Sequence, residues 1–396
     1  MHRNTSEVVR QGFLAAFGGE PEGVWSAPGR VSLMGDHTDL EDGITYGFTY
    51  EARSAVAIAR RDDREIRIRT DLDEVGVDAA LDELEHPGAH SWRDYPVGVI
   101  RALRDWIADH PPVDLEPAKR ATGLDVFITT DVPIGGGLAS SASLCAALTT
   151  ALNELWELEQ SPYRLARFGH EVENGYIGAS AGMSDHVTVH FGGPEHDVFY
   201  DARGGDVSLI DEPDLAAAGF VPLLIESGET HRNWAGTVND RHAACKAVAD
   251  ELGLNALREC DVDELEAARD RLDAVAYRRA RYIVTETQRV LDFTRLLRTE
   301  GPAAVGRLFT ESQRSLRDDF EVSTERVDAI CDTALAAGAE GARMTGSGFG
   351  GCVFALVPTE RVDAVRESLA AAYAERGWDG LEIYEAHSSP GTRRDV

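Results

Sequence analysis

Residues 131–156 read DVPIGGGLASSASLCAALTTALNELW, and this stretch passes from an apolar strand through three glycines into a long helix rich in Ala and Leu. Glycine accepts positive φ angles and lets a ligand approach the main chain closely. The helix that follows presents unpaired N–H groups and a partial positive charge, which together favour an anion. Ser140 and Ser141 fall in its first turn, where hydroxyl groups can ligate a Mg²⁺ carried by phosphates. We therefore predict a phosphate-binding loop; the alternative is a glycine turn that the serines merely cap.

A polar cluster lies upstream of this loop, in SAPGRVSLMGDHTDLEDG at residues 26–43. Arg30, Asp36, His37 and Asp39 fall at a predicted strand end and in the turn after it. Such a cluster suits the recognition of several sugar hydroxyls, each of which can donate to a carboxylate. His37 and Asp39 also resemble half of a metal site, but no other ligand-like spacing supports that alternative.

A second glycine-rich loop lies downstream, in RMTGSGFGGCVFALV at residues 343–357, where Thr345 and Ser347 stand among four glycines. A loop of this kind either makes a tight crossing of two backbones or approaches a phosphate. Composition does not choose between these two alternatives.

Two carboxylates stand 12 residues apart in EVENGYIGASAGMSDHVTVHFGG, residues 171–193. Glu173 lies near the end of a predicted helix, and Asp185 lies at the entry to a predicted strand, because DHVTVHFG alternates as a strand does. The two can converge on one site, one on a cation and one on a substrate proton; solvated surface acids are the alternative. His186 and His190 would share a helix face, but the strand pattern argues against zinc.

Around these four segments, strands and helices alternate in both halves of the chain, which predicts two α+β domains, 1–200 and 201–396. Strands are expected at 55–61, 65–70, 124–132 and 221–227, and on both sides of the loop in 341–357. Helices are expected at 91–109, 139–158, 160–177, 235–253, 263–298, 301–317, 323–337 and 359–376. Residues 71–88 and 110–123 are expected to be solvated connections, and the last residues, SSPGTRRDV, a polar tail.

Composition excludes several classes of protein. The chain has 396 residues with 39 basic and 69 acidic side chains, a formal net charge of −30. This charge argues against binding to nucleic acid or anionic membranes. No run of about 18 apolar residues predicts a membrane span, and the N-terminal residues resemble an amphipathic helix ending at Gly18 rather than a signal peptide. A cytoplasmic protein is expected, and a monomer is favoured.

The basic and sulfur-containing residues refine this interpretation. The chain has only two lysines, Lys119 and Lys246. Neither lies in the loop at 131–156, so this loop is not a Walker A motif. A shortage of lysine together with an excess of acidic residues is typical of proteins from a salt-adapted cytosol. An acidic enzyme from an ordinary cytosol is the alternative. The five cysteines have no CxxC pair, and we expect buried free thiols.

Together and in this order, the segments resemble the GHMP kinase superfamily and, within it, the galactokinase family. GRVSLMGDHTDLEDG is similar to the family's GR[VI]NLIGEHTDYN-G, PIGGGLASSA to P-x-G-x-G-L-x-S-S-A, and GARMTGSGFGGC to GSRMTGAGFGGC. Weaker similarities fill the gaps, so the resemblance runs from about residue 26 to 357. It implies an N-terminal domain of ribosomal-S5-like type, a ferredoxin-like C-terminal domain and an active site between them.

The resemblance also implies an activity: the phosphorylation of a sugar at its 1-hydroxyl by ATP with Mg²⁺. Asp185 would be the base and Arg30 would keep it ionised, since a neighbouring positive charge lowers a carboxyl pKa. Asp36, His37 and Asp39 would bind sugar hydroxyls, and Ser141 and Glu173 would hold Mg²⁺. The ATP loop would comprise Pro133, Gly135, Gly136, Gly137, Leu138, Ser140 and Ser141.

Departures from the family pattern concern the sugar. Asp36 replaces the usual glutamate, Val238 replaces a tyrosine, and Leu40-Glu41 replaces the usual Y-N. Lost hydroxyl partners can redirect specificity. Alternatives to galactose are therefore arabinose, a uronic acid or an amino sugar, and a non-catalytic sensor is the alternative from another class.

Overall fold

The computed structural model describes residues 4–84, 91–110, 120–229 and 234–396. Strands and helices mix in both halves around two sheets, which confirms the α+β expectation. No helix within these ranges combines the length and the apolar character that a membrane span requires.

The larger sheet has eight strands. Its main path runs β12-β1-β2-β5-β3-β4, and the hairpin β6–β7 joins it through the pairing of β6 with β2. The pairings are antiparallel except for β3 with β5. The bounds are β1 Gly23–Met34, β2 Ile44–Arg61, β3 Glu65–Thr70, β4 Val77–Ala80, β5 Gly123–Thr130, β6 His196–Asp201, β7 Asp206–Asp211 and β12 Arg393–Arg394.

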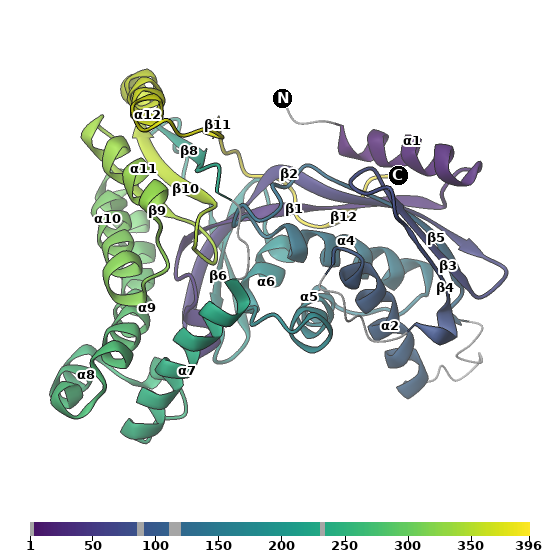
Figure 1. Ribbon diagram of the computed structural model, residues 1–396, viewed down its shortest axis with the longest axis horizontal. Helices are drawn as coiled ribbons and strands as arrows, with labels where there is room; N and C mark the ends of the chain where they lie inside the picture. Colours follow the sequence, from purple (N-terminus) through teal and green to yellow (C-terminus); the bar gives the residue numbers. More distant parts are fainter. Residues whose placement is uncertain (1–3, 85–90, 111–119, 230–233) are drawn as a thin grey trace.

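Helices cover both faces of this sheet (Figure 1). The helix α1 (Thr5–Phe17) packs Val9 and Phe13 against one face and ends at Gly18, as predicted. The opposite face packs against α2, α4 and α5, and their apolar residues form the larger core with Trp25 and Val56. The bounds are α2 Asp94–Asp109, α4 Ser140–Leu155, α5 Pro162–Val172 and α6 Ser184–Phe191.

The smaller sheet has the order β11-β8-β10-β9 and is antiparallel throughout, with bounds β8 Phe220–Glu226, β9 Gly341–Met344, β10 Cys352–Pro358 and β11 Glu382–Glu385. Helices beyond residue 233 accompany it (Figure 1): α7 Trp234–Leu252, α8 Val262–Ala268, α9 Ala274–Glu300, α10 Gly306–Ser315, α11 Glu325–Ala336 and α12 Val362–Arg376. All five cysteines are free and buried, as predicted.

Several predicted elements differ in the structure. The segment that begins at Asp185 was expected to be a strand, but it forms the helix α6. Its buried valines and threonine face more than one side of this helix, so the sequence shows no helical period. The single helix expected at 263–298 is two helices, since the side chain of Asp273 caps a new start at α9.

The connecting segments also hold structure. The connection expected at 71–88 contains β4, whereas residues 85–90 and most of the expected connection at 110–123 lie outside the described ranges. The polar tail contains the two-residue strand β12, which pairs with β1. The larger sheet thus takes strands β7 and β12 from beyond residue 200, the expected domain boundary.

Candidate active site

Arg30 joins the first strand to the glycine-rich loop. The pairing of β1 with β2 is irregular before and after Arg30, and such bulges re-aim side chains beside active sites. The main-chain N–H of Arg30 donates to the carbonyl of Leu138 at 3.1 Å, and Nη1 donates to the carbonyl of Gly137 at 2.5 Å. Main chain and side chain therefore both hold Arg30 against the loop.

Arg30 also forms a two-point ion pair with Asp185, in the first turn of α6. Nε donates to Oδ1 and Nη2 to Oδ2, each at 2.8 Å, which is the strong fork geometry of guanidinium and carboxylate. Burial raises the pKa of Asp185; Arg30 lowers it, and the net pKa lies above the ordinary value. The pairing was expected, but burial outweighs the effect of the guanidinium on the pKa.

The loop before α4 has a conformation suited to glycine. Gly135 and Gly137 have φ angles of 74° and 75°, and Ala139 also has a positive φ. No side chain within the described residues caps α4, which begins at Ser140. The N–H groups of its first turn therefore point out of the helix end without a side-chain acceptor, as an anion site requires.

The two glycine-rich loops cross each other. A Cβ atom on Gly137 would lie 2.5 Å from the carbonyl oxygen of Thr345, and one on Gly346 would lie 2.4 Å from that of Gly137. The N–H of Cys352 donates to the carbonyl of Gly136 at 3.0 Å. Of the two alternatives for the loop in 343–357, the structure therefore shows the tight backbone crossing.

Glu173 lies at the start of a π-helical turn that follows α5, and it is 4% exposed. Its Oε2 lies 2.6 Å from Nε2 of His186. Burial raises the pKa of Glu173, but His186 and the hydroxyl of Ser141 more than offset this effect, and the net pKa lies below the ordinary value. Helix α4 thus brings a serine hydroxyl beside an ionised, buried carboxylate.

Metal ligands are sparse in the described part of the chain. No group of three or more His, Cys, Asp or Glu side chains gathers there as a metal site would require. His186 and His190 do share a helix, but His186 contacts Glu173 rather than facing a third ligand.

Asp36 is held by the second glycine-rich loop. Oδ2 accepts from Nη2 of Arg343, and Oδ1 accepts from the N–H of Gly346 at 2.8 Å. Arg343 is fully buried and lies 3.9 Å from Glu286 of α9, which accepts from the N–H of Gly35. Sequence reasoning assigned no role to Arg343 or Glu286; an arginine inside an apolar strand was the available signal.

His37 and Asp39 occupy the turn after Asp36. The His37 ring lies 4.9 Å from Phe320 and 5.8 Å from His242, and burial followed by the charge of His242 lowers its pKa well below the ordinary value. Oδ2 of Asp39 accepts from the N–H of Ser184 at 2.9 Å and so caps α6 beside Asp185. The structure therefore brings Asp39 and Asp185 together, and places His37 beside His242, which sequence reasoning missed.

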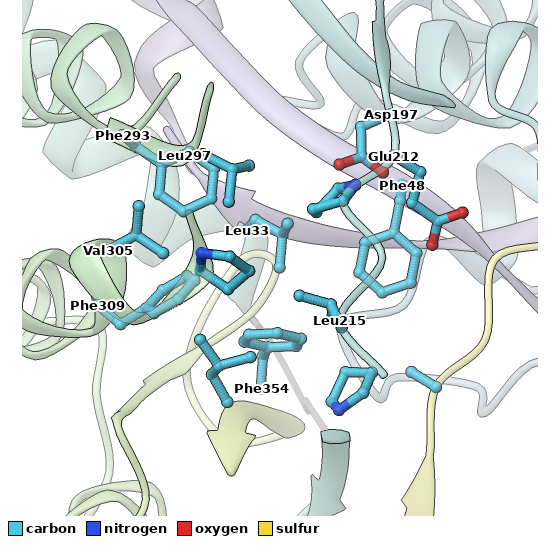
Figure 2. Close-up of a pocket in the computed structure, with 15 residues that line it drawn as sticks. Leu33, Phe48, Asp197, Glu212, Leu215, Phe293, Leu297, Val305, Phe309 and Phe354 are labelled. Atoms are coloured by element: carbon cyan, nitrogen blue, oxygen red, sulfur yellow. The ribbon is translucent and has the colours of Figure 1, made fainter. Parts of the chain in front are cut away.

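A separate cavity of about 40 Å³ lies between the larger sheet and α9, α10 and β10 (Figure 2). Its lining is apolar except for Asp197 and Glu212, and none of the residues above lines it. Asp197 accepts from the Tyr46 hydroxyl at 2.9 Å, and burial raises its pKa to about 7.

Comparison with known proteins agrees with this fold. Residues 94–193 match the GHMP kinases N terminal domain, residues 293–375 match the GHMP kinases C terminal domain, and residues 11–60 match the Galactokinase galactose-binding signature. A mevalonate kinase structure shares the fold, with 19% identity and a TM-score of 0.64 over 92% of this chain and 98% of that one. The fold and the family models thus define a GHMP kinase.

Closer relatives narrow the family. The chain is 39% identical to a galactokinase from Streptomyces coelicolor, over 98% of each chain, and 37% identical to one from Mycobacterium bovis, over 93% of this chain and 98% of the relative. The structure of Lactococcus lactis galactokinase complexed with galactose has a TM-score of 0.89, with 25% identity, and covers 98% of this chain and 99% of that one. The chain belongs to the galactokinase family of sugar kinases.

Proposed function

We propose that this protein transfers the γ-phosphoryl group of ATP to the 1-hydroxyl of galactose, giving galactose 1-phosphate and ADP. One observation carries the proposal: the ion pair of Arg30 with Asp185 stands directly beside the carbonyl of Gly137 in the glycine-rich loop. A base and a cation therefore face the loop that would hold the phosphates.

Asp185 is proposed as the base. The oxygen of the 1-hydroxyl forms the new bond to phosphorus, the bond from phosphorus to the bridging oxygen of ADP breaks, and the hydroxyl proton passes to the Asp185 carboxylate. Phosphoryl transfer depends mainly on positioning and charge neutralisation. Arg30 supplies both, because it orients the carboxylate through two hydrogen bonds and its positive charge offsets charge on the phosphoryl group.

The ATP phosphates are proposed to lie against the loop and the N-terminus of α4, along Pro133, Gly135, Gly136, Gly137, Leu138, Ser140 and Ser141. The uncapped first turn of α4 supports this placement.

The sugar is proposed to bind at the turn of residues 36–39. The buried Nε2 of His37 has no hydrogen-bond partner among the described residues and suits a hydroxyl. Asp39 lies at the start of α6 beside Asp185. Both oxygens of Asp36 already accept one hydrogen bond, and each keeps a second lone pair for a sugar hydroxyl.

Ser141 and Glu173 fit a Mg²⁺ ion. A hydroxyl and an ionised carboxylate side by side are hard oxygen ligands, and Mg²⁺ typically takes only one or two protein ligands beside the substrate phosphates. Bound there, the ion would neutralise phosphate charge.

The proposed activity is tested by incubating the purified protein with ATP, Mg²⁺ and galactose in molar KCl and examining the product by ³¹P NMR. The proposal expects phosphate attached at the anomeric carbon. Phosphorylation of galactose at another carbon would contradict it. Binding of both ligands without any product would favour the sensor.

We also infer that the protein works in a salt-rich cytoplasm. The net charge of −30 supports this, because salt screens the repulsion that such a charge creates. A thermal midpoint that rises steadily between 0.1 and 2 M KCl is expected; a midpoint that does not change with salt would contradict the inference.

A further inference from the structure

We propose that His186 is a positioning residue that orients the carboxylate of Glu173 toward the cation and ties it to the base, Asp185. The inference rests on the proposed function, which assigns Glu173 to the cation and Asp185 to the sugar hydroxyl.

The contact between His186 and Glu173 is short and buried. Nε2 of the ring lies 2.6 Å from Oε2 of the carboxylate, and the two side chains are 0% and 5% exposed. A buried carboxylate held by the His186 ring, with the Ser141 hydroxyl beside it, loses its freedom to rotate. Hydrogen-bond partners of this kind orient metal ligands and hold them ready.

The neighbouring helix is shaped around the His186 ring. Gly169 lies inside α5, and a Cβ atom there would lie 2.6 Å from Nδ1 and 2.8 Å from Cε1 of His186. Glycine weakens a helix interior, so its presence calls for a packing reason. The imidazole ring, packed with Nδ1 and Cε1 close to the bare backbone of Gly169, supplies that reason.

The same short helix carries the base. Asp185 and His186 are consecutive in the first turn of α6; one faces Arg30 and the other faces Glu173. The segment between Glu173 and α6 is also held, because the side chain of Asn174 exchanges hydrogen bonds of 3.1 and 3.2 Å with the main chain of Ala181. The separation of base and cation carboxylate is therefore set by one helix.

The test measures cation binding without turnover. Mn²⁺, which takes oxygen ligands as Mg²⁺ does, is titrated by electron paramagnetic resonance into the full-length protein saturated with a non-hydrolysable ATP analogue and no sugar. His186→Leu removes the donor at similar volume, and its Mn²⁺ affinity should fall about tenfold or more. His186→Gln places an amide N–H near Nε2 and should restore the affinity to within about threefold.

His190→Leu is the matched control, because His190 lies one turn along the same helix and its buried Nε2 has no hydrogen-bond partner among the described residues. It should leave Mn²⁺ affinity unchanged. Gly169→Ala is a second, independent variant, which should weaken Mn²⁺ binding by pushing the ring from its place.

Wild-type affinity in His186→Leu, or an equal loss in His190→Leu, would overturn the proposal. If His186→Leu does not fold, normal affinity in Gly169→Ala would overturn it, and a loss there together with normal affinity in His186→Gln would support it. A wild-type protein that binds Mn²⁺ with the analogue but phosphorylates no sugar would contradict the proposed function. It would not contradict the role of His186 in orienting Glu173 toward the cation.

Discussion

Arg30 and Asp185 stand 155 residues apart in the chain, and their side chains meet through two hydrogen bonds of 2.8 Å. Arg30 comes from a bulged strand and Asp185 from the first turn of a short helix. The proposed chemistry depends on this pair.

Replacing Asp185 by Asn should abolish most turnover and leave ligand binding almost intact. The amide still accepts a hydrogen bond from Arg30 but cannot take a proton from the sugar. The loss of a general base costs roughly 10²- to 10⁴-fold in kcat. Steady-state turnover and calorimetric titration with ATP and galactose test this, with the exposed Asp363→Asn as control. A turnover near that of the wild type would show that Asp185 is not the base.

The rate should fall on the acid side at a pH above the ordinary carboxyl range. The pKa of Asp185 is raised, and the carboxyl group stays protonated until the pH exceeds that pKa. The protonated form cannot accept the proton of the sugar hydroxyl. Since Arg30 lowers the pKa of Asp185, Arg30→Gln should move the acid limb of kcat/KM to higher pH, and Arg30→Lys should move it less. Identical acid limbs in the three proteins would contradict the assignment.

A side chain at Gly346, where the two glycine-rich loops cross, should destabilise the fold. Gly346 has a φ of 86° and its Cβ would meet the carbonyl of Gly137, which also accepts from Arg30. Gly346→Ala should cost about 3 kcal/mol in the free energy of unfolding, from clash and strain together, and raise KM for ATP.

Gly253→Ala is the matched control, because Gly253 has a φ of 72° but no atom within 4 Å of the added Cβ. It should cost only about 1 kcal/mol and leave KM unchanged. Denaturant unfolding measures the loss in the free energy of unfolding for each variant. Equal losses in the two variants would mean that the close crossing of the loops adds no steric cost at Gly346.

Asp197, in the cavity of Figure 2, should make stability fall as the pH rises. Its pKa is raised to about 7 in the fold, so the folded state holds the proton more tightly than the unfolded chain, where the pKa is about 3.9. The resulting stabilisation is complete below about pH 4 and is lost as the pH approaches 7. Asn cannot ionise, so the thermal midpoint of Asp197→Asn should exceed that of the wild type by a margin that grows between pH 4 and 8. The exposed Asp206→Asn is the control, and a margin that is constant with pH would contradict the prediction.

Local patterns predicted the elements that carry their own period or turn chemistry. The strand, loop and helix around residues 131–156 follow from an apolar run, three glycines and a long Ala/Leu period. The sequence of α6 predicts a strand instead, because its β-branched residues are buried on several sides and leave no polar face to mark a helical period.

Contacts between distant segments could not be predicted from local pattern. The pairing of Arg30 with Asp185 was anticipated through the family resemblance alone. The burial of Arg343 against Asp36 and Glu286 joins three segments of the chain and appears only once they are folded together. The same holds for the contact of His186, in α6, with Glu173, which lies in the π-helical turn after α5.

The central claim is tested most directly by the kcat/KM of the purified protein with ATP and Mg²⁺ in molar KCl, across galactose, glucose, arabinose, galacturonate and N-acetylgalactosamine. We predict turnover on galactose that exceeds every other sugar in the panel by at least about tenfold, roughly 1.4 kcal/mol of transition-state discrimination. A higher kcat/KM on any other sugar, or none on galactose with protein shown to be folded, would contradict the account.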